Sequence, residues 1–271
     1  MATPTRNHWF TLVPACILFG CFLALVVIAA SLGPSKFFVS PTREGISLLR
    51  DDQELGVFYK RITFAYQHQL PYQHQRIEYP PLAVAYLALP TLFSSSYQGY
   101  RTGLMVQNVV FAMGLLAVTL ATLRQLGLPS RRWLLFLLPS FAYQVVNRFD
   151  VLPALIVQLA FLFLFRKRYQ LAFLALSVAF LAKGYSVIFF PIFFLAWLHD
   201  RHERGDVSLL WNTPLKLFVL PIAAVTAGTC ALVGIERGLF PYIFQSLRGF
   251  AYGVVYIPLL YSFAAALSHG Q

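Results

Sequence analysis

The stretch QLPYQHQRIEYPPLAVAYLALP, residues 69–90, changes character at its middle, where a polar run passes through a proline pair into an apolar segment. Glu78 and Tyr79 stand directly before Pro80 and Pro81. Proline fixes φ and lacks a backbone N–H, so the pair predicts a helix start and prevents that helix from extending back into the polar run. The stretch therefore places an acidic side chain at the boundary between an aqueous loop and an apolar helix.

Apolar segments of this kind recur along the whole chain. Of the 271 residues, 58% are apolar and only 11% are charged, and the mean hydropathy is +0.66. This balance is far from that of a soluble domain and predicts an all-α, polytopic membrane protein. We expect one transmembrane domain over residues 1–271, with about seven or eight membrane helices. The apolar runs that supply them are residues 9–32, 81–93, 104–123, 133–146, 151–165, 169–182, 185–198, 217–233 and 251–267.

The net charge of +11 does not indicate a nucleic-acid partner. The basic residues are scattered through short loops between apolar runs, as positive-inside topology requires, and form no alternating basic and aromatic patch. Cys16, Cys21 and Cys230 lie inside apolar runs and form no CxxC pair. They are predicted to be small core hydrophobes.

Basic residues also predict how the chain crosses the membrane. Arg166, Lys167 and Arg168 lie between two apolar runs, and Arg201 and Arg204 follow another. Both loops are expected on the cytoplasmic side, together with the N-terminus of the chain. The segments then expected at the outer face are residues 33–79, 147–150, 183–185 and 235–249.

This count of spans requires one apolar run between residues 81 and 146 not to cross the membrane. A helix of about 14 residues rises only ~21 Å, whereas the hydrocarbon core is ~30 Å thick. Residues 81–93 and 133–146 are both short, and we favour 133–146, broken at Pro139, as a re-entrant or partial helix. No cleavage site follows residues 9–32, so an uncleaved anchor in a plasma or inner membrane is expected.

The outer loop of residues 33–79 contains a predicted amphipathic helix that lies on the membrane surface. Its apolar positions recur at helical spacing and its basic positions occupy the other side. The apolar positions are Leu55, Phe58 or Tyr59, Ile62 and Tyr66, and the basic ones are Lys60 and Arg61. Asp51, Asp52 and Glu54 stand at its N-terminal end, where carboxylates suit the helix dipole. One interpretation is that these acids are only capping charges on a solvated face.

The stretch ELGVFYKRITFAYQHQLPYQHQRIEYPPLAV resembles the first extracytoplasmic loop of the family 87 glycosyltransferases, enzymes of the GT-C class that use polyprenyl-phosphate sugars. The family has an Asp, an aromatic pair, a Pro-Tyr turn and E-Y-P-P-L before the next span. Without a gap, this register places Glu54 on the Asp and the E-Y-P-P-L motif on residues 78–82. It also places the aromatic pair on residues 58–59 and the Pro-Tyr turn on residues 71–72.

Further segments extend the resemblance to about residues 9–260. NRFDVLPAL, residues 147–155, is similar to the family's R-F-D-x-L-P-A-L, and residues 180–193 are similar to its A-x-x-K-x-Y-P segment, with Ser186 replacing the proline. Arg248 begins a weaker match to an R-G motif. The chain stops where relatives continue for several spans, which leaves open a minimal enzyme, one that needs a partner subunit, or an inactive truncated homologue.

The resemblance implies a GT-C-like helix bundle and an inverting transfer of a hexose, mannose-like, from a polyprenyl-phosphate donor to a lipid or glycan acceptor at the extracytoplasmic face. Such a reaction needs a base for the acceptor hydroxyl and cations for the departing phosphate. Glu54 is the expected base, with Asp52 and Asp51 as alternatives, because the longer Glu moves the reactive oxygen by about one C–C bond. Only one of the three needs to act.

Arg148, Lys183 and Arg248 are the expected phosphate ligands, because Arg forks onto phosphate oxygens and Lys offers a compact charge. The alternatives are that Lys183 only extends to the interface and that Arg148 only pairs with Asp150. Asp150 opens an apolar run, where an ionisable group contacts a partner or substrate. Helix capping by Asn147 or Asp150 is the other interpretation.

Three further residues complete the expected substrate site. Glu78 can orient the acceptor or nearby basic side chains, and Tyr79 and Tyr185 accompany it in the family's motifs. The alternative for Glu78 and Tyr79 is a plain helix start with the tyrosine in an aromatic belt. No metal and no cofactor are expected, because a lipid monophosphate has less charge to neutralise than a nucleotide diphosphate and the six histidines form no ligand motif.

The competing class is a transporter or flippase for a lipid or small solute, which also has broken helices and polar groups at span ends. Its ionisable residues usually lie near the middle of the membrane. In this sequence nearly all of them lie at span ends or in the predicted outer loops. Membrane lipids, the lipid-linked sugar and its acceptor are the expected partners.

Overall fold

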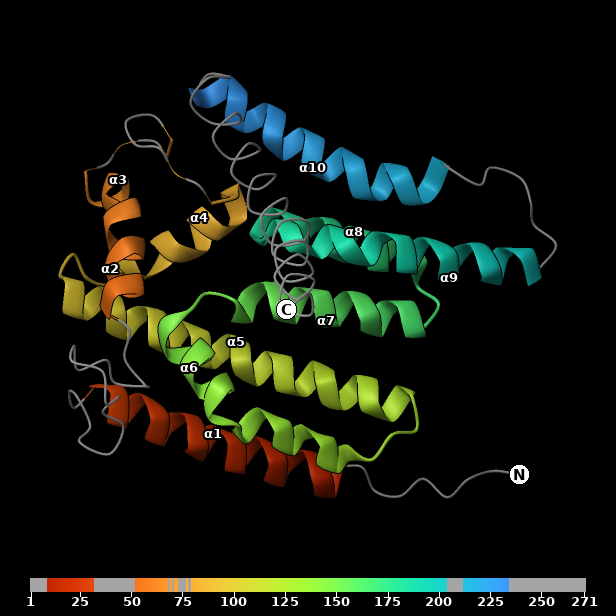
Figure 1. Cartoon of the computed structure of the whole chain (residues 1–271), viewed down its shortest axis with the longest axis horizontal. Helices are drawn as coiled ribbons and strands as arrows, with labels where there is room; N and C mark the ends of the chain where they lie inside the picture. The colour runs from red at the N-terminus through yellow and green to blue at the C-terminus, as the bar shows by residue number, and fades with distance from the viewer. Residues whose placement is uncertain are drawn as a thin grey trace, which may run out of the picture.

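The structure is a computed structural model that describes residues 9–31, 52–67, 69, 71–72, 77, 79–203 and 212–233. The described part is all-α, as predicted, and contains no strand within those ranges (Figure 1). Its α-helices are α1 (Trp9–Ser31), α2 (Asp52–Arg61), α3 (Thr63–Tyr66), α4 (Pro81–Ala88), α5 (Tyr97–Gln125), α6 (Pro139–Asn147), α7 (Val151–Phe165), α8 (Tyr169–Ala182), α9 (Phe190–Glu203) and α10 (Asn212–Val233). Three 3-10 helices join them, η2 (Leu89–Leu92), η3 (Ser130–Leu137) and η4 (Gly184–Phe189).

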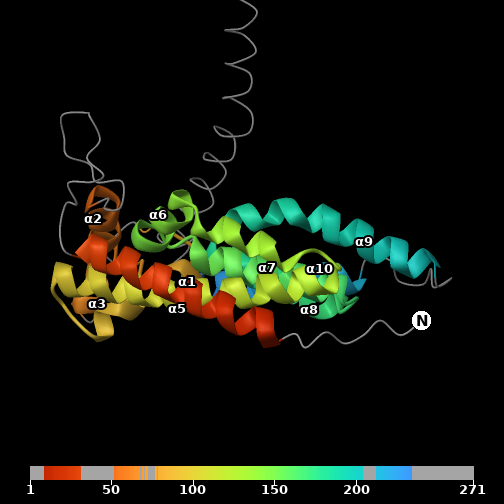
Figure 2. The same cartoon turned by 90° about the horizontal axis from the view of Figure 1, so that it is seen from below.

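The long helices form a layer. In Figure 1, α1, α5, α7, α8 and α10 lie side by side in this order, with α2 and α3 at one end. Figure 2 views the layer from its edge, with α2, α6 and α9 rising on the same side of it. Helices α7 and α8 form an antiparallel hairpin, so their connection at residues 166–168 lies at one end of the hairpin and residues 150 and 183 lie at the other.

The predicted amphipathic helix is present but is divided at Ile62 into α2 and α3, and its apolar side faces protein. Leu55, Phe58 and Ile62 are at most 1% exposed and pack with residues of α4 and α5 and with Phe149. Burying a side chain of this size contributes about 1.5–3 kcal/mol, so this contact holds α2 firmly on the bundle. The helix was expected on the membrane surface, but α4 and α5 provide an apolar partner for the same face.

Two helices are long and apolar enough to cross a membrane, Val13–Ser31 within α1 and Tyr97–Gln125, which is α5. The pair α6 and α7 qualifies as a third only as one broken span, because it is bent by 115°. These are fewer than the about seven or eight spans expected. Three shorter apolar helices also occur, and residues 251–267 lie outside the described part. Ile17, Leu18 and Leu25 are 59–67% exposed on α1, which favours contact with lipid.

The predicted break at Pro139 is confirmed. Leu138 is extended and ends η3, and Pro139 occupies the first turn of α6, where its missing N–H costs nothing. A second break follows at residues 148–150, where the chain turns by 115° from α6 into α7. This second break carries the charged residues of the NRFD motif.

Candidate functional site

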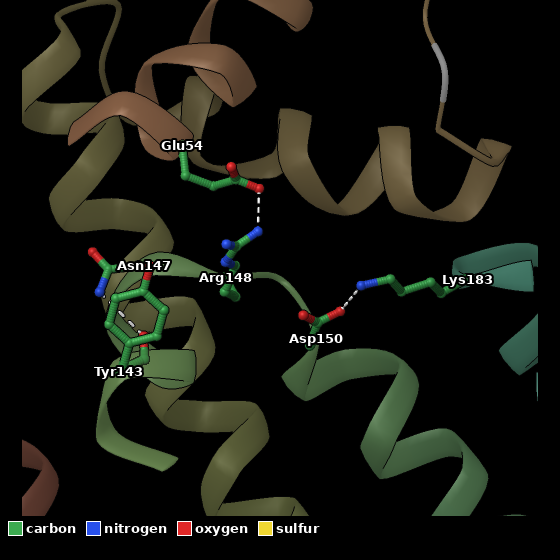
Figure 3. A network of polar contacts seen from close by, with 6 residues as sticks. All are labelled: Glu54, Tyr143, Asn147, Arg148, Asp150 and Lys183. Carbon is green, nitrogen blue, oxygen red and sulfur yellow. Dashed lines mark hydrogen bonds and ion pairs between the residues drawn. The ribbon is translucent and has the colours of Figure 1, made fainter. Parts of the chain in front are cut away.

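An ion pair joins the first turn of α2 to the break between α6 and α7. Arg148 Nη1 donates to Glu54 Oε1 across 94 positions of sequence (Figure 3). The two side chains are 35% and 30% exposed, so a ligand can reach both of them. Arginine stays protonated at physiological pH, and its fork of donors can serve a carboxylate and a second anion together.

A second ion pair lies beside the first. Lys183 Nζ donates to Asp150 Oδ1, which joins the end of α8 to the start of α7 (Figure 3). These side chains are 38% and 32% exposed. The Lys183 ammonium also lies 5.1 Å from the ring centroid of Phe149, a cation–π contact. Two carboxylates and two cations from three separate segments are thus gathered at one end of the α7–α8 hairpin.

Phe149 anchors the segment that carries Arg148 and Asp150. It is 5% exposed, and its ring lies 5.5 Å from that of Phe58 and 5.4 Å from that of Tyr79, both edge to face. This geometry is favourable for aromatic rings and adds to the area that they bury. The aromatic pair of α2 and the E-Y-P-P-L segment therefore meet the NRFD motif directly.

Asn108, a fully buried amide in the middle of α5, fixes the break between α6 and α7. Its Nδ2 donates to the carbonyls of Val145 and Arg148 at 2.8 and 2.7 Å. Its Oδ1 accepts a hydrogen bond from the Tyr86 hydroxyl of α4. The end of a helix leaves carbonyls without helical partners, and here one amide satisfies two of them. Sequence reasoning missed Asn108, although a polar residue inside an apolar run was a usable signal.

The Pro-Tyr turn closes onto the residue before the proline pair. Tyr72 has φ 67 and is 4% exposed, and its hydroxyl donates to the Tyr79 carbonyl at 2.8 Å. A positive φ is uncommon for a bulky residue and indicates a backbone held by its surroundings. The turn therefore fixes the position of Tyr79, and of the start of α4, relative to α2.

An aromatic cluster around Tyr59 attaches the far side of α2 to the start of α5. The Tyr59 ring lies 5.4–5.5 Å from those of Tyr66, Tyr97 and Tyr100, and its hydroxyl donates to the Ser95 carbonyl at 2.7 Å. Burial and, after it, the phenol of Tyr59 raise the pKa of Tyr66 to about 12. Tyr66 therefore stays neutral at physiological pH, as suits a structural contact.

The structure decides between several of the alternatives. Arg148 pairs with Glu54 in α2, and not with its neighbour Asp150. Asp150 occupies the N-cap position of α7 but makes no side-chain capping bond, and its carboxylate binds Lys183. Asn147 is fully buried and donates to the Tyr143 carbonyl inside α6, and the N-cap residue of α7 is Asp150. Lys183 is held by the ion pair and does not merely extend to an interface.

The other expected site residues are placed as follows. Asp52 is the first residue of α2, and Tyr185 lies in η4, 39% exposed and within electrostatic range of Asp150. Asp51, Glu78 and Arg248 lie outside the described residues. The structure thus brings Glu54, Tyr79, Arg148, Asp150, Lys183 and Tyr185 to the same end of the α7–α8 hairpin.

The site combines acid–base and anion-binding groups in one place. Within the described ranges, no group of three or more His, Cys, Asp or Glu side chains is arranged to hold a metal ion.

Comparison of the chain with protein-family models, curated proteins and solved structures finds no match.

Proposed function

We propose that this chain is an integral membrane glycosyltransferase, which moves a mannose-like hexose from a polyprenyl-phosphate donor to a lipid or glycan acceptor at the extracytoplasmic face. The observation that carries the proposal is the convergence of Glu54, Arg148, Asp150 and Lys183 at one end of the α7–α8 hairpin. Three of the segments that meet there are those whose sequences resemble the family 87 enzymes.

The proposed reaction uses one carboxylate as a base. The acceptor hydroxyl oxygen attacks the anomeric carbon while Glu54 accepts its proton, and the carbon inverts. The bond from that carbon to the donor phosphate oxygen breaks, and its electron pair stays on the phosphate. A base in contact with the hydroxyl typically contributes 10²–10⁴-fold to the rate.

The two cations are suited to the phosphate that leaves. Arg148 can keep Glu54 on one edge of its guanidinium and bind phosphate oxygens with other donors. Lys183 has three donors, of which Asp150 takes one in the structure. In the resting protein the two carboxylates balance the two cations, so neither cation is unpaired before a phosphate arrives.

The bend of 115° beside these charges favours a second candidate, a carrier for the lipid-linked sugar. Transporters build their sites where helices are broken, because helix ends and freed backbone groups can bind substrate there. This candidate needs the same charged residues but forms no new glycosidic bond. An inactive homologue that only binds the donor is the third reading of the same site.

The decisive assay adds a labelled polyprenyl-phosphate mannose to sealed membrane vesicles of either orientation, with the protein, without it, or with Glu54→Gln. A transferase gives a labelled glycoconjugate that depends on Glu54, and only when the donor reaches the outer face. Labelled lipid that crosses the bilayer unchanged identifies a carrier. Binding without either outcome identifies an inactive homologue and rejects the transferase proposal.

A further inference from the structure

A second polar region lies at the opposite end of the α7–α8 hairpin. It is a cavity of about 470 Å³ between the α7–α8 turn, the end of α9 and the start of α10. Its lining includes Lys167, Arg168, Phe173, Trp197, Asp200 and Arg201. Helix α7 has 15 residues, so this cavity lies ~22 Å along the hairpin from Asp150 and Lys183.

Positive charge dominates the lining. Lys167, Arg168 and Arg201 contribute three cations, against one carboxylate from Asp200. Asp200 is 7% exposed and accepts a hydrogen bond from Lys167 Nζ at 2.7 Å, while the Lys167 side chain is 61% exposed. The cavity therefore favours an anion over a neutral ligand or a cation.

The basic turn that forms one side of the cavity is held by its backbone. The N–H of Lys167 donates to Leu164 O at 2.9 Å, and the N–H of Arg168 donates to Phe163 O at 2.9 Å. Lys167 adopts φ 57, which reverses the chain between α7 and α8. The two cations are therefore positioned by a closed turn and do not depend on a long loop.

The first turn of α8 lines the same cavity. Tyr169, Gln170 and Leu171 all border it, and α8 begins at Tyr169. The first N–H groups of a helix lack helical partners and carry partial positive charge, which attracts phosphate and other anions. This contribution adds to the three side-chain cations, which identify the site independently.

The inner wall of the cavity is apolar. Phe173 and Trp197 are 1% and 4% exposed, and the Arg201 guanidinium lies 5.5 Å from the centroid of the Trp197 ring. Leu171 borders the cavity and is 41% exposed. A ligand here meets basic groups and apolar groups together, as the phosphate and glycerol of a lipid do at a membrane surface.

We propose that this cavity binds the phosphate headgroup of an anionic lipid. Its volume suits a headgroup, while the acyl chains extend along the exposed apolar sides of α8 and α9. Basic pockets between helices at the cytoplasmic end of membrane proteins bind such headgroups. The inference does not depend on the proposed sugar transfer, since the two regions share no residue.

The test titrates the purified full-length protein in neutral detergent with dioctanoyl phosphatidic acid and counts bound lipid by native mass spectrometry. Dioctanoyl phosphatidylcholine and inorganic phosphate are titrated in parallel. Phosphatidic acid should bind at least about tenfold more tightly than either, because it alone offers both the doubly charged phosphate and the apolar chains. Equal binding of inorganic phosphate would identify a free-phosphate site and reject the lipid headgroup.

Matched variants locate the binding. Arg168 lines the cavity and Arg166, in the same turn, does not. Arg168→Gln should weaken phosphatidic acid binding about tenfold, and Arg166→Gln should change it less than about twofold. Asp200→Asn removes the carboxylate from the lining and should tighten binding, which a misfolded variant cannot do. Equal losses in both arginine variants, or no gain in Asp200→Asn, would overturn the proposal.

Discussion

The two ends of the α7–α8 hairpin use the same kinds of charged side chain in different proportions. At the end near α2, two carboxylates pair with two cations, and all four side chains are about a third exposed. At the other end, near the start of α10, three cations and one carboxylate line a cavity. A balanced cluster is suited to the proposed proton transfer, whereas a cavity with excess positive charge is suited to the proposed anion binding. The ratio of cations to carboxylates, and not the type of residue, distinguishes the two proposed roles.

The largest effect is expected for the base of the balanced cluster. Glu54→Gln keeps the size of the side chain but cannot accept a proton, so sugar transfer should fall by about 10²–10⁴-fold while donor binding remains. Initial rates and donor binding in the same membranes measure this. Glu203→Gln, at an exposed carboxylate near the other end, is the matched control and should stay active.

Two further variants sharpen the assignment of Glu54. Glu54→Asp restores the residue that the family 87 pattern has and should retain transfer. If Asp52→Asn is inactive while Glu54→Gln is active, the base is Asp52. If neutral variants of Asp51, Asp52 and Glu54 all transfer sugar normally, a base in this loop is excluded.

An intermediate effect is expected from removing one cation at each end. Lys183→Ala should raise the donor KM or lower kcat by about ten- to hundredfold, because a charge-assisted contact contributes ~1.5–3 kcal/mol. Lys167→Ala removes the same charge from the cavity and should leave the transfer kinetics within about twofold. Steady-state kinetics with varied donor concentration test both variants. Equal losses would show that the two ends do not act separately, and this would break the comparison.

The smallest effect is expected on stability. Asn108→Ala leaves two carbonyls and the Tyr86 hydroxyl without their amide partner, which should cost about 1–3 kcal/mol of unfolding free energy. The Tm in detergent should fall by about 2–4 °C for each kcal/mol. Gln107→Ala, beside it, loses one hydrogen bond to the Tyr86 carbonyl and should be milder. A larger loss for Gln107→Ala would contradict the role of Asn108 at the break.

Local chemistry made part of this structure predictable from sequence. The helical spacing of Leu55, Phe58 and Ile62 predicts α2, and Pro139 predicts a helix break, because both effects act over a few residues. The sequence also predicts that the NRFD segment, Lys183 and the first loop share one site, and the ion pairs of Glu54 and Asp150 bring these segments together. Their location at the outer face of a membrane stays a prediction.

Long-range choices were not predictable in the same way. Arg148 has a carboxylate two residues away in sequence and binds one 94 positions away, because the packing of α2 decides which acid it meets. The cavity near Lys167 forms where three helix ends meet, and the sequence of no single end predicts it. Which charges pair and where a cavity forms depend on how the helices pack. A single sequence does not specify this packing for each residue.

Lys167 connects the cavity to a conflict between stability and ligand affinity. It follows Arg166, the C-cap residue of α7, and adopts the left-handed conformation, at a position that glycine usually occupies because a side chain there costs about 1–2 kcal/mol. The chain nevertheless has a lysine there, the partner of Asp200. A glycine at this position would relax the backbone, but it would remove a cation from the cavity and the ion-pair partner of Asp200, which is only 7% exposed. The strained backbone of this turn is therefore tied to the charge that the turn presents, and a substitution that relieves the first removes the second.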